Sequence, residues 1–234
     1  MIPDPLTPQT LAAVIDHTFL KPSGNQNDIE KLCSEAARFG FAMVAINPAE
    51  VETCVRLLKG TAVRTGAAIG FPLGQNTVAV KHYEIDDAIQ HGAGEIDMVI
   101  NIRALQSGRT DLVRDEIAGM AERCRAAGVI SKVILETCYL TDEEKRLVCS
   151  TAHECGADFV KTSTGFGPAG ATIADVKLMR EVVGPRMGVK AAGGIRDLTT
   201  ALQMLDAGAS RLGTSSGVAI IETLRQRIAD MTDR

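Results

Sequence analysis

The sequence predicts an α/β fold, specifically a (β/α)8 (TIM) barrel formed by a single domain over residues 1–234, with a short N-terminal helical extension. Three observations lead to this prediction. The length of 234 residues suits one large α/β domain. Composition is even, and no low-complexity linker divides the chain. A local pattern also recurs, in which an amphipathic run is followed by a glycine and then by a short apolar segment.

The amphipathic runs predict helices. In the first long run the apolar residues follow the spacing of one helical face, namely Ile29, Leu32, Cys33, Ala36 and Ala37. Asn27 with Glu30, and Thr141 with Glu144, have the spacing of N-terminal capping pairs. Glycines that predict left-handed helix ends follow five of the runs, at Gly40, Gly92, Gly128, Gly156 and Gly208.

The short apolar segments predict strands, because they are too brief for helices and are rich in Val and Ile. Their near-continuous apolarity indicates burial on both faces, as parallel sheets require. Eight candidates lie near 15–20, 41–47, 65–71, 95–101, 131–137, 158–163, 187–192 and 210–214. A doubly wound open sheet remains an alternative, although the Gly-rich turn that usually follows its first strand is absent here.

Composition argues against several classes of function. The aromatic fraction is 3% with no Trp, and the net charge is −4, so we expect no nucleic-acid partner. No signal peptide and no apolar segment of membrane-spanning length is present, so we expect no membrane association and a cytoplasmic location. The six cysteines show no Cys-x-x-Cys pair and are expected to be reduced core residues.

Three charged residues are predicted to meet inside the barrel. In segment 95–101, Ile96 and Met98 suit the face covered by helices, so the alternation of a strand turns Asp97 inward. Lys161 and Lys190 occur in the sixth and seventh candidate strands, and each is followed by a loop rich in Gly, Ser or Thr. A single lysine at a strand end is usually a surface residue, but two on neighbouring strands favour a site.

Clustered lysines suggest a nucleophile. A free lysine has a pKa near 10.4 and is protonated at neutral pH, so it cannot attack a carbonyl group. A shift of roughly 3 units, or about 4 kcal/mol, would bring it close to 7. A neighbouring cation and partial burial supply shifts of this size. The sequence therefore predicts that one of the two lysines is a Schiff-base nucleophile, with its pKa lowered by the other.

The loops after the last three candidate strands predict an anion site, because glycine amides and hydroxyl groups can surround a phosphate group. Barrels often bind phosphate after the seventh and eighth strands. A metal site is not expected, since the four histidines lack the spacing of zinc ligands. Catalytic cysteine chemistry is not expected either, and Cys138 is interpreted as a packing residue.

At this point the motifs identify a resemblance. Lys-Thr-Ser-Thr-Gly at 161–165, Lys-Ala-Ala-Gly-Gly at 190–194 and the segment around Asp97 resemble the 2-deoxyribose-5-phosphate aldolases, a class I family. The resemblance runs from about Ile15 to about Gly217. It implies reversible cleavage of 2-deoxy-D-ribose 5-phosphate to D-glyceraldehyde 3-phosphate and acetaldehyde, with no cofactor. It also implies an imine on Lys161, with Lys190 and Asp97 taking part in proton transfer.

The resemblance implies further site residues. Asp16, Lys132 and Thr164 match positions that line the site of the family. The implied phosphate-binding residues are Gly165, Gly193, Gly194, Ser215 and Ser216. A homodimer is expected at the level of the family.

The chain also departs from some relatives. Phe166 occupies a position where some relatives have a lysine, which removes one counter-charge for phosphate and leaves Arg196 or neutral donors to compensate. Some relatives end in a tyrosine that assists proton abstraction, whereas this sequence ends at Arg234, so we expect that step to depend on Asp97, Lys190 and water. Two alternatives remain open: another phosphosugar enzyme, such as an isomerase or a transaldolase-like enzyme, and a non-catalytic sugar-phosphate sensor.

Overall fold

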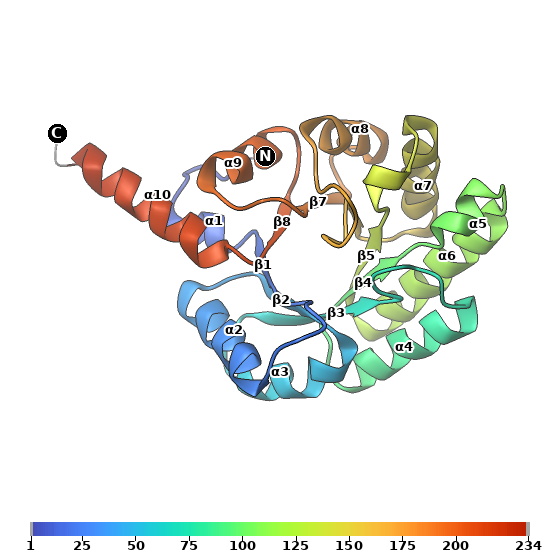
Figure 1. Ribbon diagram of the computed structural model, residues 1–234, viewed down its shortest axis with the longest axis horizontal. Helices are drawn as coiled ribbons and strands as arrows, with labels where there is room; N and C mark the ends of the chain where they lie inside the picture. Colours follow the sequence, from blue (N-terminus) through green and yellow to red (C-terminus); the bar gives the residue numbers. More distant parts are fainter. Residues whose placement is uncertain (1, 233–234) are drawn as a thin grey trace.

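The computed structural model describes residues 2–232. Within this range, eight parallel strands pair in sequence order, and β8 pairs with β1 to close a barrel (Figure 1). The strands are β1 (Ile15–Thr18), β2 (Met43–Ile46), β3 (Arg64–Ile69), β4 (Glu95–Val99), β5 (Ile130–Ile134), β6 (Phe159–Lys161), β7 (Gly188–Ala192) and β8 (Arg211–Thr214). Each predicted segment contains one of them or overlaps it closely. The closed barrel confirms the predicted fold and excludes the open-sheet alternative.

Helices follow the strands and surround the barrel (Figure 1). They are α2 (Gln26–Phe39), α3 (Val51–Leu57), α4 (Val78–Gln90), α5 (Ile102–Gln106), α6 (Thr110–Ala127), α7 (Asp142–Cys155), α8 (Ile173–Val183), α9 (Leu198–Asp206) and α10 (Gly217–Thr232). Two short 3-10 turns, η1 (Pro48–Glu50) and η2 (Thr137–Tyr139), lie in the loops after β2 and β5. Among the described residues, no helix is long and apolar enough to cross a membrane.

The predicted N-terminal extension is the helix α1 (Pro8–Ala12). A capping box formed by Thr7 and Thr10 starts it, and Pro8 occupies its first turn, where no N–H donor is needed. Leu11 and Ala12 are fully buried, and the helix packs against α10 (Figure 1). The extension therefore contacts the last helix of the barrel.

The helix ends correct one prediction and confirm another. The cap of α2 is Asn25, which forms a complete capping box with Asp28, so the predicted pair of Asn27 and Glu30 is wrong. Asn25 has an extended backbone that leaves its side chain free to accept from the N–H of Asn27, which already belongs to the helix. At α7 the predicted pair is confirmed: Thr141 and Glu144 bond to each other's backbone N–H at 3.2 and 2.8 Å.

The predicted glycine stops are also found. Gly40, Gly128 and Gly156 cap their helices in the left-handed conformation. Gly92 and Gly208 follow one residue after the caps of α4 and α9, also with positive φ angles. A residue without a side chain adopts this backbone at least cost, so these helices end where the sequence predicted.

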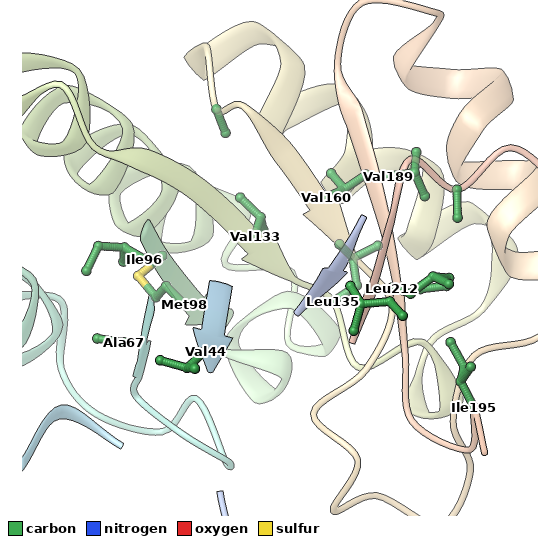
Figure 2. Close-up of a cluster of buried hydrophobic side chains, with 14 of the residues drawn as sticks. Val44, Ala67, Ile96, Met98, Val133, Leu135, Val160, Val189, Ile195 and Leu212 are labelled. Atoms are coloured by element: carbon green, nitrogen blue, oxygen red, sulfur yellow. The ribbon is translucent and has the colours of Figure 1, made fainter. Parts of the chain in front are cut away.

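The apolar core lies between the strands and the helices. Figure 2 shows part of it, with Ile96 and Met98 of β4 in the same cluster as Val133 of β5 and Leu212 of β8. Because side chains alternate along a strand, Asp97 faces the barrel interior, as predicted. The six cysteines are free; Cys138 and Cys155 are partly exposed, and the others are buried. The interior of the barrel carries charges instead, and these form the candidate site.

Candidate active site

A cavity of about 650 Å³ opens at the C-terminal ends of the strands. Its wall comes from α2 and from the loops that follow β1, β6, β7 and β8. This is the end of a (β/α)8 barrel where active sites are built, because the loops there are free to vary while the strands hold them in place.

Below the cavity, Asp97 binds three lysines. Its Oδ1 lies 2.7 Å from Nζ of Lys132, and its Oδ2 lies 2.8 Å from Nζ of Lys161 and 2.7 Å from Nζ of Lys190. Strand register explains the meeting, since Asp97 pairs with Lys132 across β4 and β5, and Lys161 pairs with Lys190 across β6 and β7. The structure thus brings together Asp97, Lys161 and Lys190, the three residues that the sequence predicted inside the barrel.

A second set of charges completes this buried cluster. Asp16 of β1 binds Lys190 at 2.5 Å and Arg211 of β8 at 2.7 Å. Glu95 contacts Lys132 and lies 3.4 Å from Arg211. Neither Glu95 nor Arg211 was predicted from the sequence to belong to the site. Glu95 could have been found, because it lies two residues before Asp97 and therefore on the same face of β4.

The cluster is not electrically balanced when all its lysines are protonated. Asp16, Glu95 and Asp97 then face four cations, namely Lys132, Lys161, Lys190 and Arg211. A further cation, Arg64, touches Glu95 from a half-exposed position at the other end of the barrel. Buried charge without a partner is costly, so the cluster favours the loss of one proton from a lysine.

Lys161 is a lysine of this cluster whose pKa is lowered. Burial lowers its pKa, the nearby Lys190 ammonium lowers it further, and Asp97 opposes both, giving a pKa of about 8. The predicted direction is therefore confirmed, although burial contributes more than the neighbouring lysine that sequence analysis emphasised. With this pKa, about a tenth of the amine is neutral at pH 7, compared with less than about a thousandth for a free lysine.

Lys132 and Asp97 remain charged. Burial alone would lower the pKa of Lys132, but Asp97 and Glu95 raise it above its ordinary value. Burial alone would raise the pKa of Asp97, yet Lys132, Lys161 and Lys190 hold it well below its usual range. The cluster therefore combines a fixed carboxylate with one amine that can become neutral.

Lys161 also has a distinct position. Of the charged residues described inside the barrel, it is the one that lines the cavity, and its side chain is 3% exposed. Asp97 and Lys190 lie directly beneath it. Asp16 and Lys132, which the resemblance implied at the site, belong to the cluster but not to the cavity wall. A carbonyl compound in the cavity would thus meet the amine of Lys161 first.

The predicted phosphate loops line the same cavity. Gly165, Gly193 and Gly194 have φ angles of 89, 82 and 80°, in the region that favours glycine, and all three form part of the wall. Thr164 and Ser215 line it as well. Ser216 does not; its N–H donates to Oγ1 of Thr214, and it lies directly before α10.

Cations are also present on the wall. Lys21 and Arg196 line the cavity, and neither takes part in an ion pair within the described residues. Lys31 is a third, but it lies 3.8 Å from Glu35. Phe166 packs edge-on against Phe71 with ring centroids 5.3 Å apart and remains half exposed. Sequence analysis named Arg196 but not Lys21 as a substitute for the charge missing at Phe166.

Glu136 is a further residue that sequence analysis missed. Its side chain is buried and contacts Thr164, whose backbone N–H lies 3.2 and 3.3 Å from the two carboxylate oxygens and whose hydroxyl group also bonds to Oε2. No sequence signal indicated it, since the contact depends on a left-handed backbone that glutamate rarely adopts.

Among residues 2–232, no three His, Cys, Asp or Glu side chains come together in a group that could hold a metal ion.

Comparison with known proteins gives a consistent result. Residues 10–223 match the model of the DeoC/LacD family aldolases. A deoxyribose-phosphate aldolase from Bacteroides thetaiotaomicron is 66% identical over 221 residues, which cover 94% of this chain and 93% of that protein. The crystal structure of a putative deoxyribose-phosphate aldolase from Coccidioides immitis matches with a TM-score of 0.89 and 41% identity over 92% of this chain and 86% of that one. A deoxyribose phosphate aldolase from Aeropyrum pernix, described as a unique tetramer, matches with a TM-score of 0.87 and 34% identity over 94% and 92%.

Proposed function

We propose that this chain, which belongs to the DeoC/LacD family of aldolases, is a class I lyase that reversibly cleaves 2-deoxy-D-ribose 5-phosphate to D-glyceraldehyde 3-phosphate and acetaldehyde. The names of relatives that match along nearly the whole chain support the substrate. The observation that carries the proposal is the position of Lys161, a lysine of lowered pKa on the wall of a cavity and directly above Asp97 and Lys190.

The reaction begins at the amine. Neutral Lys161 attacks the aldehyde carbon of the open-chain sugar, and the carbinolamine loses water to give an imine. The protonated imine then draws electrons from the bond between carbons 2 and 3. That bond breaks as the hydroxyl group on carbon 3 loses its proton and becomes the aldehyde of glyceraldehyde 3-phosphate. The enamine left on Lys161 gains a proton at carbon 2, and water releases acetaldehyde.

Asp97 and Lys190 are suited to the proton transfers. Asp97 lies within hydrogen-bond distance of the nucleophile and of Lys190, so a proton can pass among the three groups with little movement. Lys132 and Asp16 hold these two residues in place through further ion pairs. Protonation of the enamine is assigned in this proposal to Asp97, Lys190 and water, because these two residues lie beside the nucleophile.

The phosphate group is proposed to lie on the side of the cavity formed by Gly165, Gly193, Gly194 and Ser215. Their backbone N–H groups are accessible because no side chain, or only a small one, covers them. Arg196 and Lys21 provide the positive charge on the same wall, without competing ion pairs in the described part of the chain. Ser216 is assigned a supporting role at the start of α10 instead of a direct contact.

The chain is proposed to act as a single domain, since the family match spans residues 10–223 without interruption. It requires a small-molecule substrate and, in this proposal, no cofactor. A homodimer, expected from the resemblance, stays a prediction that light scattering of the purified protein would test.

Trapping the imine tests the proposal. The protein is incubated with acetaldehyde, reduced with borohydride and digested, and the modified residue is identified by mass spectrometry. We expect the adduct on Lys161 in the wild type and none in Lys161→Met. Lys31→Met is the control, because Lys31 lines the same cavity but pairs with Glu35. An adduct on another lysine, or cleavage activity retained by Lys161→Met, would contradict the mechanism.

A further inference from the structure

We propose that Glu136 is a positioning residue, which holds the hydroxyl group of Thr164 as a hydrogen-bond acceptor for a hydroxyl group of the sugar substrate. The inference rests on the proposed function and adds to it a basis for selecting hydroxylated substrates. Three observations carry it: the backbone of Glu136, its contacts, and the place of Thr164 in the cavity.

The backbone of Glu136 is unusual. Its φ and ψ angles are 56 and 63°, and it is the one residue other than glycine with a positive φ within residues 2–232. This conformation is strained for a residue with a side chain, so the surrounding structure must hold it in place. Two hydrogen bonds hold the residues on either side of Glu136. The Leu135 N–H donates to the Lys161 carbonyl at the end of β6, and the Thr137 N–H donates to the Thr162 carbonyl, each at 2.9 Å.

The contacts of Glu136 fix the direction of the Thr164 hydroxyl group. A carboxylate can only accept hydrogen bonds, and here it accepts from both the backbone N–H and the hydroxyl group of Thr164. The hydroxyl group has one proton, which this bond uses. One of its two lone pairs accepts from the Phe166 N–H at 3.0 Å. The remaining lone pair can only accept, so the group is prepared for a donor.

Thr164 presents this acceptor close to the nucleophile. It follows Lys161 by three residues, and both line the same cavity. The sugar carries hydroxyl groups that can donate to it, including the one that becomes an aldehyde on cleavage. Acetaldehyde carries none. A site built to bond a hydroxyl group discriminates strongly against compounds that lack it, because the buried polar group is then left without a partner.

Glu136→Gln tests the inference by placing an amide where the carboxylate was. Glutamine is nearly the same size, but one of the two oxygens that face Thr164 becomes an NH2 donor. This donor either opposes the Thr164 N–H or donates to the Thr164 hydroxyl oxygen, so the orientation of Thr164 is disturbed. We expect kcat/KM for cleavage of 2-deoxyribose 5-phosphate to fall about 10- to 100-fold. The rate of borohydride trapping with acetaldehyde should stay within about 2-fold of wild type, because imine formation needs no acceptor at Thr164.

Two further variants guard against a general loss of structure. Glu136→Gly removes the carboxylate while favouring the observed backbone, and it should show the same split between the two rates. Glu143→Gln, an exposed position on α7, is the matched control and should change neither. Equal loss of cleavage and trapping in both Glu136 variants, or no loss of cleavage in either, would overturn the inference.

A double mutant shows whether Glu136 acts through Thr164. Thr164→Val keeps the shape and removes the hydroxyl group, so adding Glu136→Gln to it should cause little further loss of cleavage. Losses that multiply would mean that the two residues act independently, and would contradict the inference. A wild-type protein without an adduct on Lys161 would instead refute the proposed function, and this is measured before any variant.

Discussion

At the scale of single residues, the site depends on keeping one of several lysines partly neutral. Lys132 and Lys161 both bind Asp97, but Lys132 also contacts Glu95, which keeps it protonated. Lys161 has Asp97 as its carboxylate partner and faces Lys190 as well. The carboxylates around each ammonium group therefore explain why the pKa of Lys132 is raised whereas that of Lys161 is lowered.

This difference predicts a pH effect. In the wild type, imine formation with acetaldehyde should rise with pH and reach its midpoint near the Lys161 pKa of about 8, because the neutral amine reacts. In Lys190→Met the repelling ammonium group is gone and Asp97 interacts more strongly with Lys161. The Lys161 pKa should then rise, and the midpoint should move to higher pH.

Rates of borohydride trapping between pH 6 and 10 would measure these midpoints. Lys31→Met, on the cavity wall but outside the cluster, should leave the midpoint unchanged. A midpoint in Lys190→Met at or below that of the wild type would show that Lys190 does not lower the pKa of Lys161.

At the scale of elements, the loops that end β6 and β7 depend on close contact between their backbones. The Cα of Gly170 lies so close to Gly193 that a Cβ on Gly193 would be 2.9 Å from it, whereas a Cβ on Gly194 would meet nothing within 4 Å. Both glycines have positive φ angles near 80°. They therefore share the same backbone requirement and differ in the space around them.

Alanine at Gly193 and at Gly194 should therefore have unequal effects on stability and on substrate binding. Gly194→Ala should cost about 1–2 kcal/mol of the free energy of unfolding, from its left-handed backbone. Gly193→Ala should cost more, because Gly170 must also move, and this should displace the loop that carries Gly165. KM for the phosphorylated sugar should therefore rise more in Gly193→Ala. Urea denaturation and steady-state kinetics of the two variants would test this, and equal effects would argue against the backbone contact.

At the scale of the whole molecule, catalysis and stability oppose each other inside the barrel. A fully protonated Lys161 gives the buried cluster four cations against three carboxylates. Its lowered pKa means that folding disfavours its charged form. The proposed nucleophile is therefore also a group whose charged form lowers the stability of the fold.

Replacing Lys161 by a neutral residue should show how much its buried charge lowers the free energy of unfolding. Lys161→Met should raise the free energy of unfolding at pH 7 by about 1–3 kcal/mol, since it removes a charge that burial disfavours. The gain should shrink as the pH rises from about 8 to 10.5, where the lysine is already neutral in the folded protein and becomes neutral in the unfolded one.

Lys132→Met is the matched comparison for this prediction. It removes a cation that Asp97 and Glu95 require, and should lower stability by about 3–5 kcal/mol. Urea denaturation of both variants at pH 7 and pH 10 would measure the difference. A loss of stability in Lys161→Met similar to that in Lys132→Met would contradict the charge balance described here.

Local patterns in the sequence were sufficient for the order of the elements and for the direction of their side chains. Alternation placed Asp97 inside the barrel, and the spacing of Thr141 and Glu144 predicted the start of α7. The same reasoning misplaced the cap of α2 by two residues, because Asn25 and Asn27 are chemically alike and only the backbone distinguishes them. Glu136 could not be predicted, since its left-handed backbone is imposed by its neighbours.

The sequence by itself determined the alternation of eight strands with helices and the inward direction of Asp97, because strand alternation and helix periodicity are local properties, while the choice between a barrel and an open sheet was decided by the pairing of β8 with β1. Only the tertiary structure decided which charges pair and which residue reaches the cavity. Asp16 and Arg211 lie 195 residues apart and meet because β8 closes on β1. The closure of the barrel and the burial of its interior decide which charges pair. Both depend on how the whole chain folds, so local sequence patterns cannot predict them.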